Sequence, residues 1–545
     1  MAERDKMIAA LANTHPQAYK EFQDAQHDSD SYKKFLHSAE RFPLSSSGRI
    51  NLMAVFAELG RKLISPTGYS GMVLPTGITT NSFTQPFFAD LVRTRSLAQI
   101  IGFENEAFIF PAVHHAFKFC VLTIAGTDIG VQEGDFVFLC RRFSDVQQEE
   151  RHFKLSVEDF ELLNPNTSTI PIFRTKRDAD LTRKIYGRVP VLWRENSDEG
   201  NPWGISFKLA FMMNTDSVHF RTEEDFGKLG GRKDRNRYII DKTLYLPLYE
   251  GKMMHQFDHR YATYEGATQA NLNAGILPQT TAAQKGDPAF AVRPRYWVEA
   301  AEVEKRLGGW KRGWLLGFRD ITSSVVERTA IFSLLPRVGA GHTLPFLFAD
   351  APSPLVACLL ANLNSLPLDY IARQKVGGTH LTYNYLRQFP VLPPDRYTAR
   401  DLAFIVPRVL ELVYTAWDMA PFAADVWAEA DEDLQLGIRN YELGMGPGAR
   451  EEGAALEPGT WNLAPFRWDD ARRARIRAEL DATYARLYGL TRDELRYILD
   501  PADVHGPEFP GETFRVLKEK EIKAYGEYRT GRLVLAAWEE LGIRN

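Results

Sequence analysis

The sequence has few cysteines, no long apolar run and no signal-peptide core, and each shortage excludes a class of protein. Its three cysteines, Cys120, Cys140 and Cys358, lie too far apart for a disulfide framework or a zinc-ligand pattern. No apolar run reaches the roughly 18 residues of a membrane span. The first residues, MAERDKMIAALANTHPQ, contain no apolar stretch of signal-peptide length. We therefore expect a cytoplasmic protein without a membrane segment.

The sequence also has little excess of either sign of charge, because its formal net charge is only −4. A global basic excess of the kind that attracts nucleic acid is therefore absent, and any DNA contact must come from a local basic face. Hydrophobic residues make up 44% and charged residues 25% of the chain, which is ordinary for a globular protein with a core. A chain of 545 residues predicts about three or four folding units.

Residues 50–125 alternate between helical and strand patterns. Apolar residues recur at helical spacing at Leu52, Val55, Phe56, Leu59 and Leu63. A short buried-type strand is predicted at 71–75, a helix at 85–94 with Phe88, Leu91 and Val92 inward, and further strands at 97–103 and 117–124. This order is typical of the closing half of a doubly wound α/β sheet.

The rest of the chain changes character twice. Residues 141–395 contain short β-like runs and an apolar helix at 353–372. Residues 396–545 read as helical, with an amphipathic helix at 469–488 and a capping box beginning at Thr491.

Several segments, taken in order, resemble one family. AVFAELGRKLISPTG, GMVLPTGITT, LAQIIGFEN and FIFPAVHHAFKFCVLTI are similar to the second half of a gamma-class adenine-N6 DNA methyltransferase of type II, type IIG-like, restriction–modification systems. LYEGKMMHQFDHRYATYE, GFRDITSSVVERTAIFSLLP and LLANLNSLPLDYIARQKVGGTHLTYNYLRQFPVLPP resemble the target-recognition region of such enzymes.

The resemblance implies an α/β fold with the second half only of a Rossmann-like methyltransferase sheet, followed by an α+β target-recognition domain and a helical C-terminal region. The expected boundaries, in order, are 1–48 for a preceding helical insertion, 49–140 for the half-sheet, 141–395 for target recognition and 396–545 for the tail. The implied cofactor is S-adenosylmethionine, and the implied partner is double-stranded DNA.

Two family motifs are missing from the sequence. The early Phe-x-Gly-x-Gly-type turn that binds S-adenosylmethionine is absent, and so is the Asn-Pro-Pro-aromatic motif that holds the target amine. The nearest string, Asn201-Pro202-Trp203, lacks the second proline. Half a parallel sheet would also leave an unpaired apolar edge strand. We therefore expect either a split enzyme, completed by an N-terminal methyltransferase half or another restriction-system subunit, or a truncated product, with no catalytic residue in this chain.

The resemblance assigns one residue to the target base. Phe110-Pro111 matches the family's aromatic turn, whose ring stacks on the flipped base, and Phe108 is the close competitor.

Residues with the chemistry for DNA contact occur in three places. Arg319 and Arg328 flank a predicted β-turn, and arginine can read guanine with two hydrogen bonds. The glycine-containing loop KVGGTHLTYN and the basic turn GGRKDRNRY suit phosphate contact. The DNA-binding candidates are Arg319, Arg328, Lys375, Thr379, His380, Arg232, Lys233 and Arg235.

Two other readings stay open. One is a non-enzymatic DNA-specificity or interaction subunit. The other is a magnesium-dependent nuclease in which Asp241 and Glu250 hold the metal and Lys252 polarises water. His255 and His259 could share a helix face and hold a metal, but a packed or DNA-facing pair is the preferred interpretation.

Overall fold

A computed structural model of the chain describes residues 2–38, 40–46, 48, 50–80, 82–115, 117–195, 197–445, 464–507, 509 and 513–542. The chain divides into two compact units, residues 1–180 and 181–545. The division falls inside α7 (Lys176–Arg188). Each unit is a mixture of helices and strands, as expected for an α/β and α+β protein.

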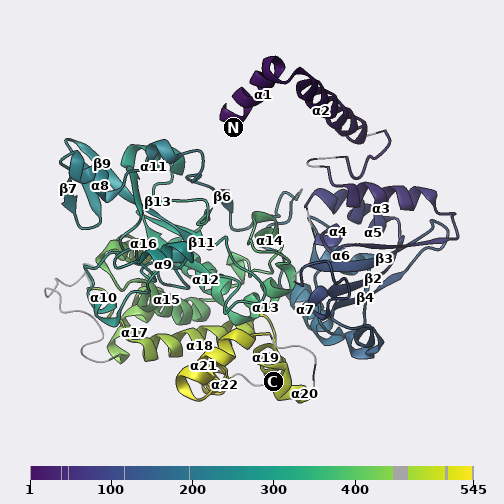
Figure 1. Ribbon diagram of the computed structural model, residues 1–545. Coiled ribbons are helices and arrows are strands. Elements are labelled where there is room, and N and C mark those ends of the chain that lie inside the picture. Colours follow the sequence, from purple (N-terminus) through teal and green to yellow (C-terminus); the bar gives the residue numbers. More distant parts are fainter. Residues whose placement is uncertain are drawn as a thin grey trace. The chain divides into compact units, whose positions relative to one another are not determined.

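The first unit contains one mixed five-stranded sheet, whose order is β1-β3-β2-β4-β5. Its strands are β1 (Tyr69–Pro75), β2 (Leu97–Glu104), β3 (Lys118–Ala125), β4 (Glu133–Cys140) and β5 (Phe153–Ser156). Its helices are α1 (Ala2–Thr14), α2 (Pro16–Leu36), α3 (Leu52–Leu63), α4 (Gly77–Thr80), α5 (Gln85–Arg93) and α6 (Val157–Leu163). Figure 1 shows α3, α5 and α6 beside this sheet.

The first three strands lie where the sequence predicts them. β3 pairs antiparallel with β1 on one side and with β2 on the other, so β1 and β2 run parallel to each other and are linked through α5. Phe88, Leu91 and Val92 of α5 are buried as expected. The sequence analysis did not identify β4, which adds parallel to β2, or β5.

The expectation of a buried first strand is wrong, and the predicted helix α3 leaves most of its large apolar residues exposed. β1 lies at the edge of the sheet, and Val73 is 57% exposed. On α3 the buried residues are small or polar (Ala54, Val55, Ala57 and Glu58), whereas Leu52, Phe56 and Leu63 are 57%, 60% and 76% exposed. Among the described strands only β3 pairs with β1, so the second edge of β1 offers free backbone groups.

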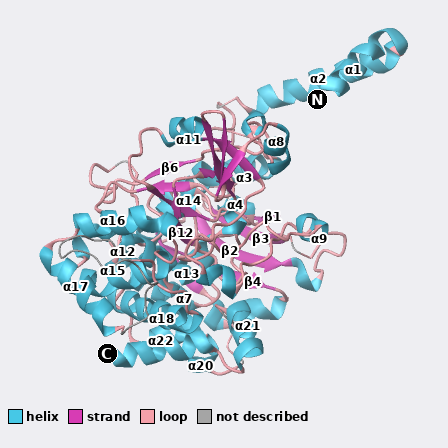
Figure 2. Ribbon diagram, turned by 90° about the vertical axis from the view of Figure 1, so that its left-hand side faces the viewer, coloured by secondary structure: helices cyan, strands magenta, loops and turns pink. Residues whose placement is uncertain are grey.

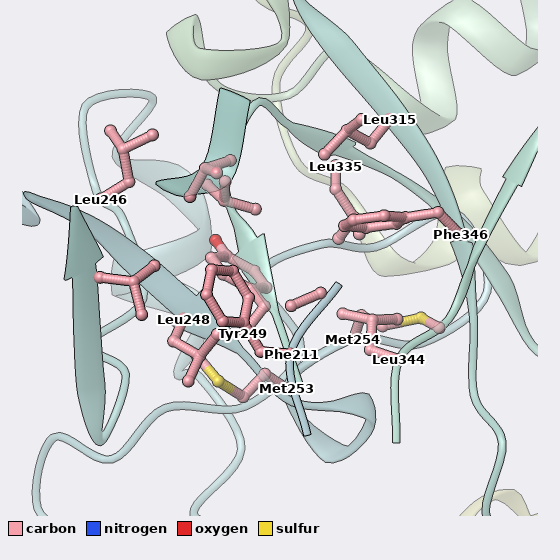
Figure 3. Close-up of a cluster of buried hydrophobic side chains, with 14 of the residues drawn as sticks. Phe211, Leu246, Leu248, Tyr249, Met253, Met254, Leu315, Leu335, Leu344 and Phe346 are labelled. Carbon is pink, nitrogen blue, oxygen red and sulfur yellow. The ribbon is translucent and has the colours of Figure 1, made fainter. Parts of the chain in front are cut away.

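The second unit contains two sheets. One has the order β10-β9-β8-β7, with β13 added beside β9, and the other has the order β12-β11-β14-β6. The strands are β6 (Ser206–Lys208), β7 (Arg232–Asp234), β8 (Arg237–Ile240), β9 (Thr243–Tyr249), β10 (Tyr296–Glu299), β11 (Trp314–Phe318), β12 (Phe332–Pro336), β13 (Gly339–Ala340) and β14 (Phe346–Phe348). Side chains from both sheets share one core, in which Leu248, Tyr249, Leu315 and Phe346 gather (Figure 3).

Helices make up the rest of the second unit, and Figure 2 shows many of them gathered at one end of it. Four short helices come first: α8 (Glu223–Lys228), α9 (Gln269–Asn273), α10 (Ala282–Gly286) and α11 (Ala300–Leu307). They are followed by α12 (Ser353–Asn364), α13 (Leu366–Lys375), α14 (Tyr383–Arg387), α15 (Ala399–Val413), α16 (Ala420–Glu429), α17 (Glu432–Gly444), α18 (Asp470–Leu487), α19 (Arg492–Leu499), α20 (Pro501–His505), α21 (Arg515–Tyr525) and α22 (Arg529–Glu540).

The predicted helix at 353–372 is two helices. Ser365 ends α12 and caps α13 by accepting a hydrogen bond from the backbone amide of Leu368, and Pro367 occupies the first turn of α13. The capping box at Thr491 is confirmed, since its side chain and that of Glu494 each accept a backbone amide.

Among the described residues, no single helix is long and apolar enough to cross a membrane, and only the bent pair of α12 and α13 meets that length and composition together.

Side-chain hydrogen bonds tie α12 and α13 to α18. Tyr484 Oη donates to the carbonyl of Cys358 at 2.6 Å, and Asp481 accepts the Leu366 amide at 2.7 Å. Asn362 Nδ2 donates to Tyr488 Oη at 2.7 Å. All of these side chains are buried, so water cannot easily replace the bonds.

Candidate nucleic-acid interface

A loop between β2 and β3 presents exposed phenylalanines, and one buried asparagine fixes its shape. Asn105 is fully buried, and its Nδ2 donates to the carbonyls of Phe110 at 3.0 Å and Val113 at 2.8 Å. Its Oδ1 accepts the Phe110 amide at 2.9 Å. Both backbone groups of Phe110 are therefore held by one side chain, which orders the loop before any ligand arrives.

The phenylalanine rings of this loop remain open to solvent. Phe110 is 42% exposed and packs edge-on against Phe119, with ring centroids 4.8 Å apart. Phe108 is 52% exposed and has a left-handed φ of +52°, which is unusual for a bulky residue. Phe117 of the same loop is 65% exposed. An exposed aromatic surface of this kind can stack a nucleobase.

The basic turn predicted in residues 230–238 is a β-hairpin formed by β7 and β8. Arg232, Arg235 and Arg237 are exposed, and the structure gives none of the three guanidinium groups a protein partner among the described residues. Lys233 differs, because its ammonium lies 3.1 Å from Glu223 and 5.8 Å from the centre of the Tyr238 ring. The three arginines are therefore free to contact phosphate.

The two arginines that flank the predicted β-turn, Arg319 and Arg328, have structural roles. Arg319 donates to the backbone carbonyls of Gly251 and Met254, and burial lowers the pKa of its guanidinium. Arg328 is only 7% exposed and forms an ion pair with the buried Asp369, Nε to Oδ2, at 2.9 Å. Neither guanidinium is free to read a base in this conformation, so these two predictions are wrong.

Some residues of the glycine-containing loop KVGGTHLTYN are buried and others are exposed. Lys375 is 6% exposed, its ammonium lies 4.8 Å from the centre of the Tyr186 ring, and burial holds its pKa well below the usual value. The prediction that it contacts DNA is wrong, because a buried lysine cannot reach phosphate. Thr379 and His380 are exposed, and His380 Nδ1 lies 2.7 Å from Asp320 Oδ2. Those two residues remain candidates.

The geometry contradicts the nuclease interpretation. Asp241 and Glu250 lie beyond opposite ends of β9, whose seven residues alone span roughly 23 Å at about 3.3 Å per residue. Glu250 instead accepts a hydrogen bond from Tyr264 Oη at 2.6 Å, and its other oxygen lies 3.3 Å from the ammonium of Lys252. Two carboxylates so far apart cannot hold one metal ion.

The histidine pair is packed, as preferred from sequence. Burial, followed by the charge of Arg319, holds the pKa of His255 well below its usual value. His259 is 1% exposed, and its Nε2 lies 2.9 Å from Asp418 Oδ1. No cluster of three or more His, Cys, Asp or Glu side chains in the described part of the chain is placed to hold a metal.

The residues present do not fit S-adenosylmethionine. The turn from β1 into α4 contains a single glycine, Gly77, and α4 is only four residues long. In the string Asn201-Pro202-Trp203, Asn201 Oδ1 accepts the Ile205 amide and Trp203 is fully buried, so neither side chain is open to a ligand. We therefore derive no step through this cofactor from these residues.

No protein-family model matches the sequence, and no curated protein is significantly similar to it. Solved structures to which the chain shows some similarity include a type IIL restriction-modification enzyme, MmeI, in complex with DNA, with 11% identity, a TM-score of 0.36 and coverage of 76% of this chain and 52% of that one. A type IIG restriction endonuclease, BpuSI, has 13% identity, a TM-score of 0.26 and coverage of 73% and 50%. A DrdV–DNA complex has 10% identity, a TM-score of 0.30 and coverage of 93% and 54%. The chain spans about half the length of these chains.

Proposed function

We propose that this chain is part of a site-specific adenine-N6 DNA methyltransferase of a restriction–modification system, and that it supplies target-base stacking and DNA recognition. The observation that carries the proposal is the exposed ring of Phe110, whose backbone is fixed by the buried Asn105. The cofactor pocket and the amine-holding motif then belong to another polypeptide segment.

The energetics of base flipping explain why an aromatic side chain would be needed. A base that leaves the duplex loses its stacking energy, and an aromatic side chain that replaces the stack contributes about 1–3 kcal/mol. Because Asn105 holds the loop in place, little ordering entropy is lost when the base arrives. Phe110 lies in the turn that the family resemblance assigns to this role, and Phe108 is the alternative in the same loop.

Phosphate contact is assigned to the β7–β8 hairpin. Its three exposed arginines (Arg232, Arg235 and Arg237) give a local positive surface on a chain of slightly negative net charge. Guanidinium groups bind phosphate with two parallel hydrogen bonds, so each can position the duplex without reading its sequence.

The free edge of β1 supports completion by another segment. The parallel pair β1 and β2, joined through α5 with the reversed β3 between them, is compatible with one end of a Rossmann-like sheet. A further strand beside β1 would satisfy its open backbone groups, and cover for Val73 and Phe56 would remove exposed apolar surface from water.

The test is reconstitution. A polypeptide from the same source that carries the glycine-rich turn and the Asn-Pro-Pro-aromatic motif is mixed with this chain, duplex DNA and methyl-labelled S-adenosylmethionine. We expect N6-methyladenine only in the complete mixture and only in one sequence context. The proposal fails if neither the mixture nor a single polypeptide that joins both segments methylates DNA.

A second candidate is a non-enzymatic DNA-specificity subunit, which the exposed arginine hairpin favours. Such a subunit would discriminate between DNA sequences alone, whereas a methyltransferase part should need the second segment. Competition binding with randomised duplexes, performed with and without that segment, separates the two.

A further inference from the structure

The second unit contains a polar cavity of about 400 Å³ that the proposed function does not use. Its walls come from helices α18, α21 and α22, from the junction of α12 and α13, and from the segment 255–261. A volume of this size is in the range of sites for small organic ligands.

Arg477 of α18 lines this cavity and has no partner. Its side chain is exposed to solvent, and the structure gives it no hydrogen bond or ion pair with any described residue. Five donors in a confined space without a fixed acceptor indicate a place for an anion or for ordered water.

The carboxylates around Arg477 are already engaged. Glu327 pairs with the ammonium of Lys520 at 2.6 Å, and Glu521 accepts both the amide and the hydroxyl of Thr530 at 2.7 and 2.6 Å. Asp481 accepts the Leu366 amide at 2.7 Å. Each of these carboxylates has another partner, and among the described residues none forms an ion pair with Arg477.

The rest of the wall suits an organic group. Phe257, Tyr261 and Tyr525 supply aromatic surface, and Arg529 rests over the Tyr525 ring at 4.8 Å. Gln279 adds amide hydrogen-bonding groups. Aromatic faces can hold a planar ring while an arginine holds a charged head group.

We infer that this cavity binds a small organic phosphate of about mononucleotide size, with the phosphate held by Arg477 and the planar part against the aromatic wall. Guanidinium and phosphate match in a bidentate geometry, which would satisfy the free donors of Arg477. Because α21, α22 and the segment 255–261 all line the cavity, an occupant would contact each of them.

The test uses the full chain and isothermal titration calorimetry with AMP, ribose 5-phosphate and inorganic phosphate at constant ionic strength. Arg477→Gln should weaken AMP binding by about 10- to 100-fold, the loss expected for charge-assisted hydrogen bonds. The matched control is Arg475→Gln, which removes the same charge from an exposed position on the same helix and should bind as the unaltered chain does.

Each outcome decides the inference. Saturable binding of AMP that is lost in the Arg477 variant and kept in the Arg475 variant supports the inference. Weaker binding of ribose 5-phosphate than of AMP shows that the aromatic wall contributes to the affinity. The inference is overturned if the unaltered chain binds none of the three probes, or if both variants bind equally well. Thermal unfolding of each variant, followed by circular dichroism, shows that the proteins compared are folded.

Discussion

Replacing the three free arginines of the β7–β8 hairpin should change the salt dependence of DNA binding in a calculable way. Each phosphate contact releases condensed counter-ions and contributes about 0.9 to the slope of log K against log salt. If Arg232, Arg235 and Arg237 each contact one phosphate, their replacement by glutamine lowers the slope by about 2.7. Between about 50 and 200 mM salt, the unaltered chain should then lose roughly 40-fold more affinity than the variant.

The assay is fluorescence anisotropy of a labelled duplex, titrated at several salt concentrations. A charge-matched control replaces three exposed arginines elsewhere in the second unit, Arg396, Arg400 and Arg475, and should leave the slope unchanged. Lys233→Gln should have a smaller effect than any one of the arginine changes, because Glu223 already neutralises that ammonium. Equal slopes for the hairpin variant and the unaltered chain would refute the assignment of phosphate contact.

The remaining predictions concern the aromatic loop and one buried carboxyl group. Asn105→Ala removes three hydrogen bonds and should destabilise the first unit by about 3 kcal/mol, measured as faster thiol labelling of the buried Cys120 and Cys140 in urea. Phe110→Ala should lower kcat/KM for methylation by the reconstituted enzyme, by an amount equivalent to about 1–3 kcal/mol, whereas Phe143→Ala should leave it unchanged. Equal losses in the two variants would contradict the stacking role of Phe110. Burial raises the pKa of Asp481 to about 6 from an ordinary 3.8, so the folded state keeps this proton longer than the unfolded chain and stability falls as pH rises from about 4 to 6. Asp481→Asn, which can still accept the Leu366 amide, should flatten that dependence and raise the free energy of unfolding at pH 7 by at most about 3 kcal/mol, measured by urea titration; an unchanged pH dependence would contradict the assignment.

Local patterns predicted several elements of both units, although β4 and β5 were missed, because helix and strand periodicity follow directly from residue spacing. The helix α5, the strands β2 and β3 and the cap at Thr491 all lie where the pattern places them. The break between α12 and α13 was missed although its signal is local, since Ser365 and Pro367 are a capping residue and a first-turn proline.

The candidate site was less predictable, because partners distant in the sequence decide whether each side chain is free or engaged. Arg328 is neutralised by Asp369, forty-one residues later, and no spacing rule reveals that pair. Lys375 is buried against Tyr186, which precedes it by nearly two hundred residues. The hairpin arginines were identified correctly as exposed basic residues because a short turn with consecutive charges can hardly be buried.

The bonds between α18 and the α12–α13 pair limit how this protein can be rebuilt. Tyr484, Asp481 and Tyr488 contact α12 and α13, so removal of the C-terminal helices would leave several buried polar groups without partners. A chimaera that exchanges the sheets of the second unit must therefore transplant them together with these helices, or redesign the buried contacts between α18 and the α12–α13 pair. Grafts confined to the exposed β7–β8 hairpin avoid this constraint.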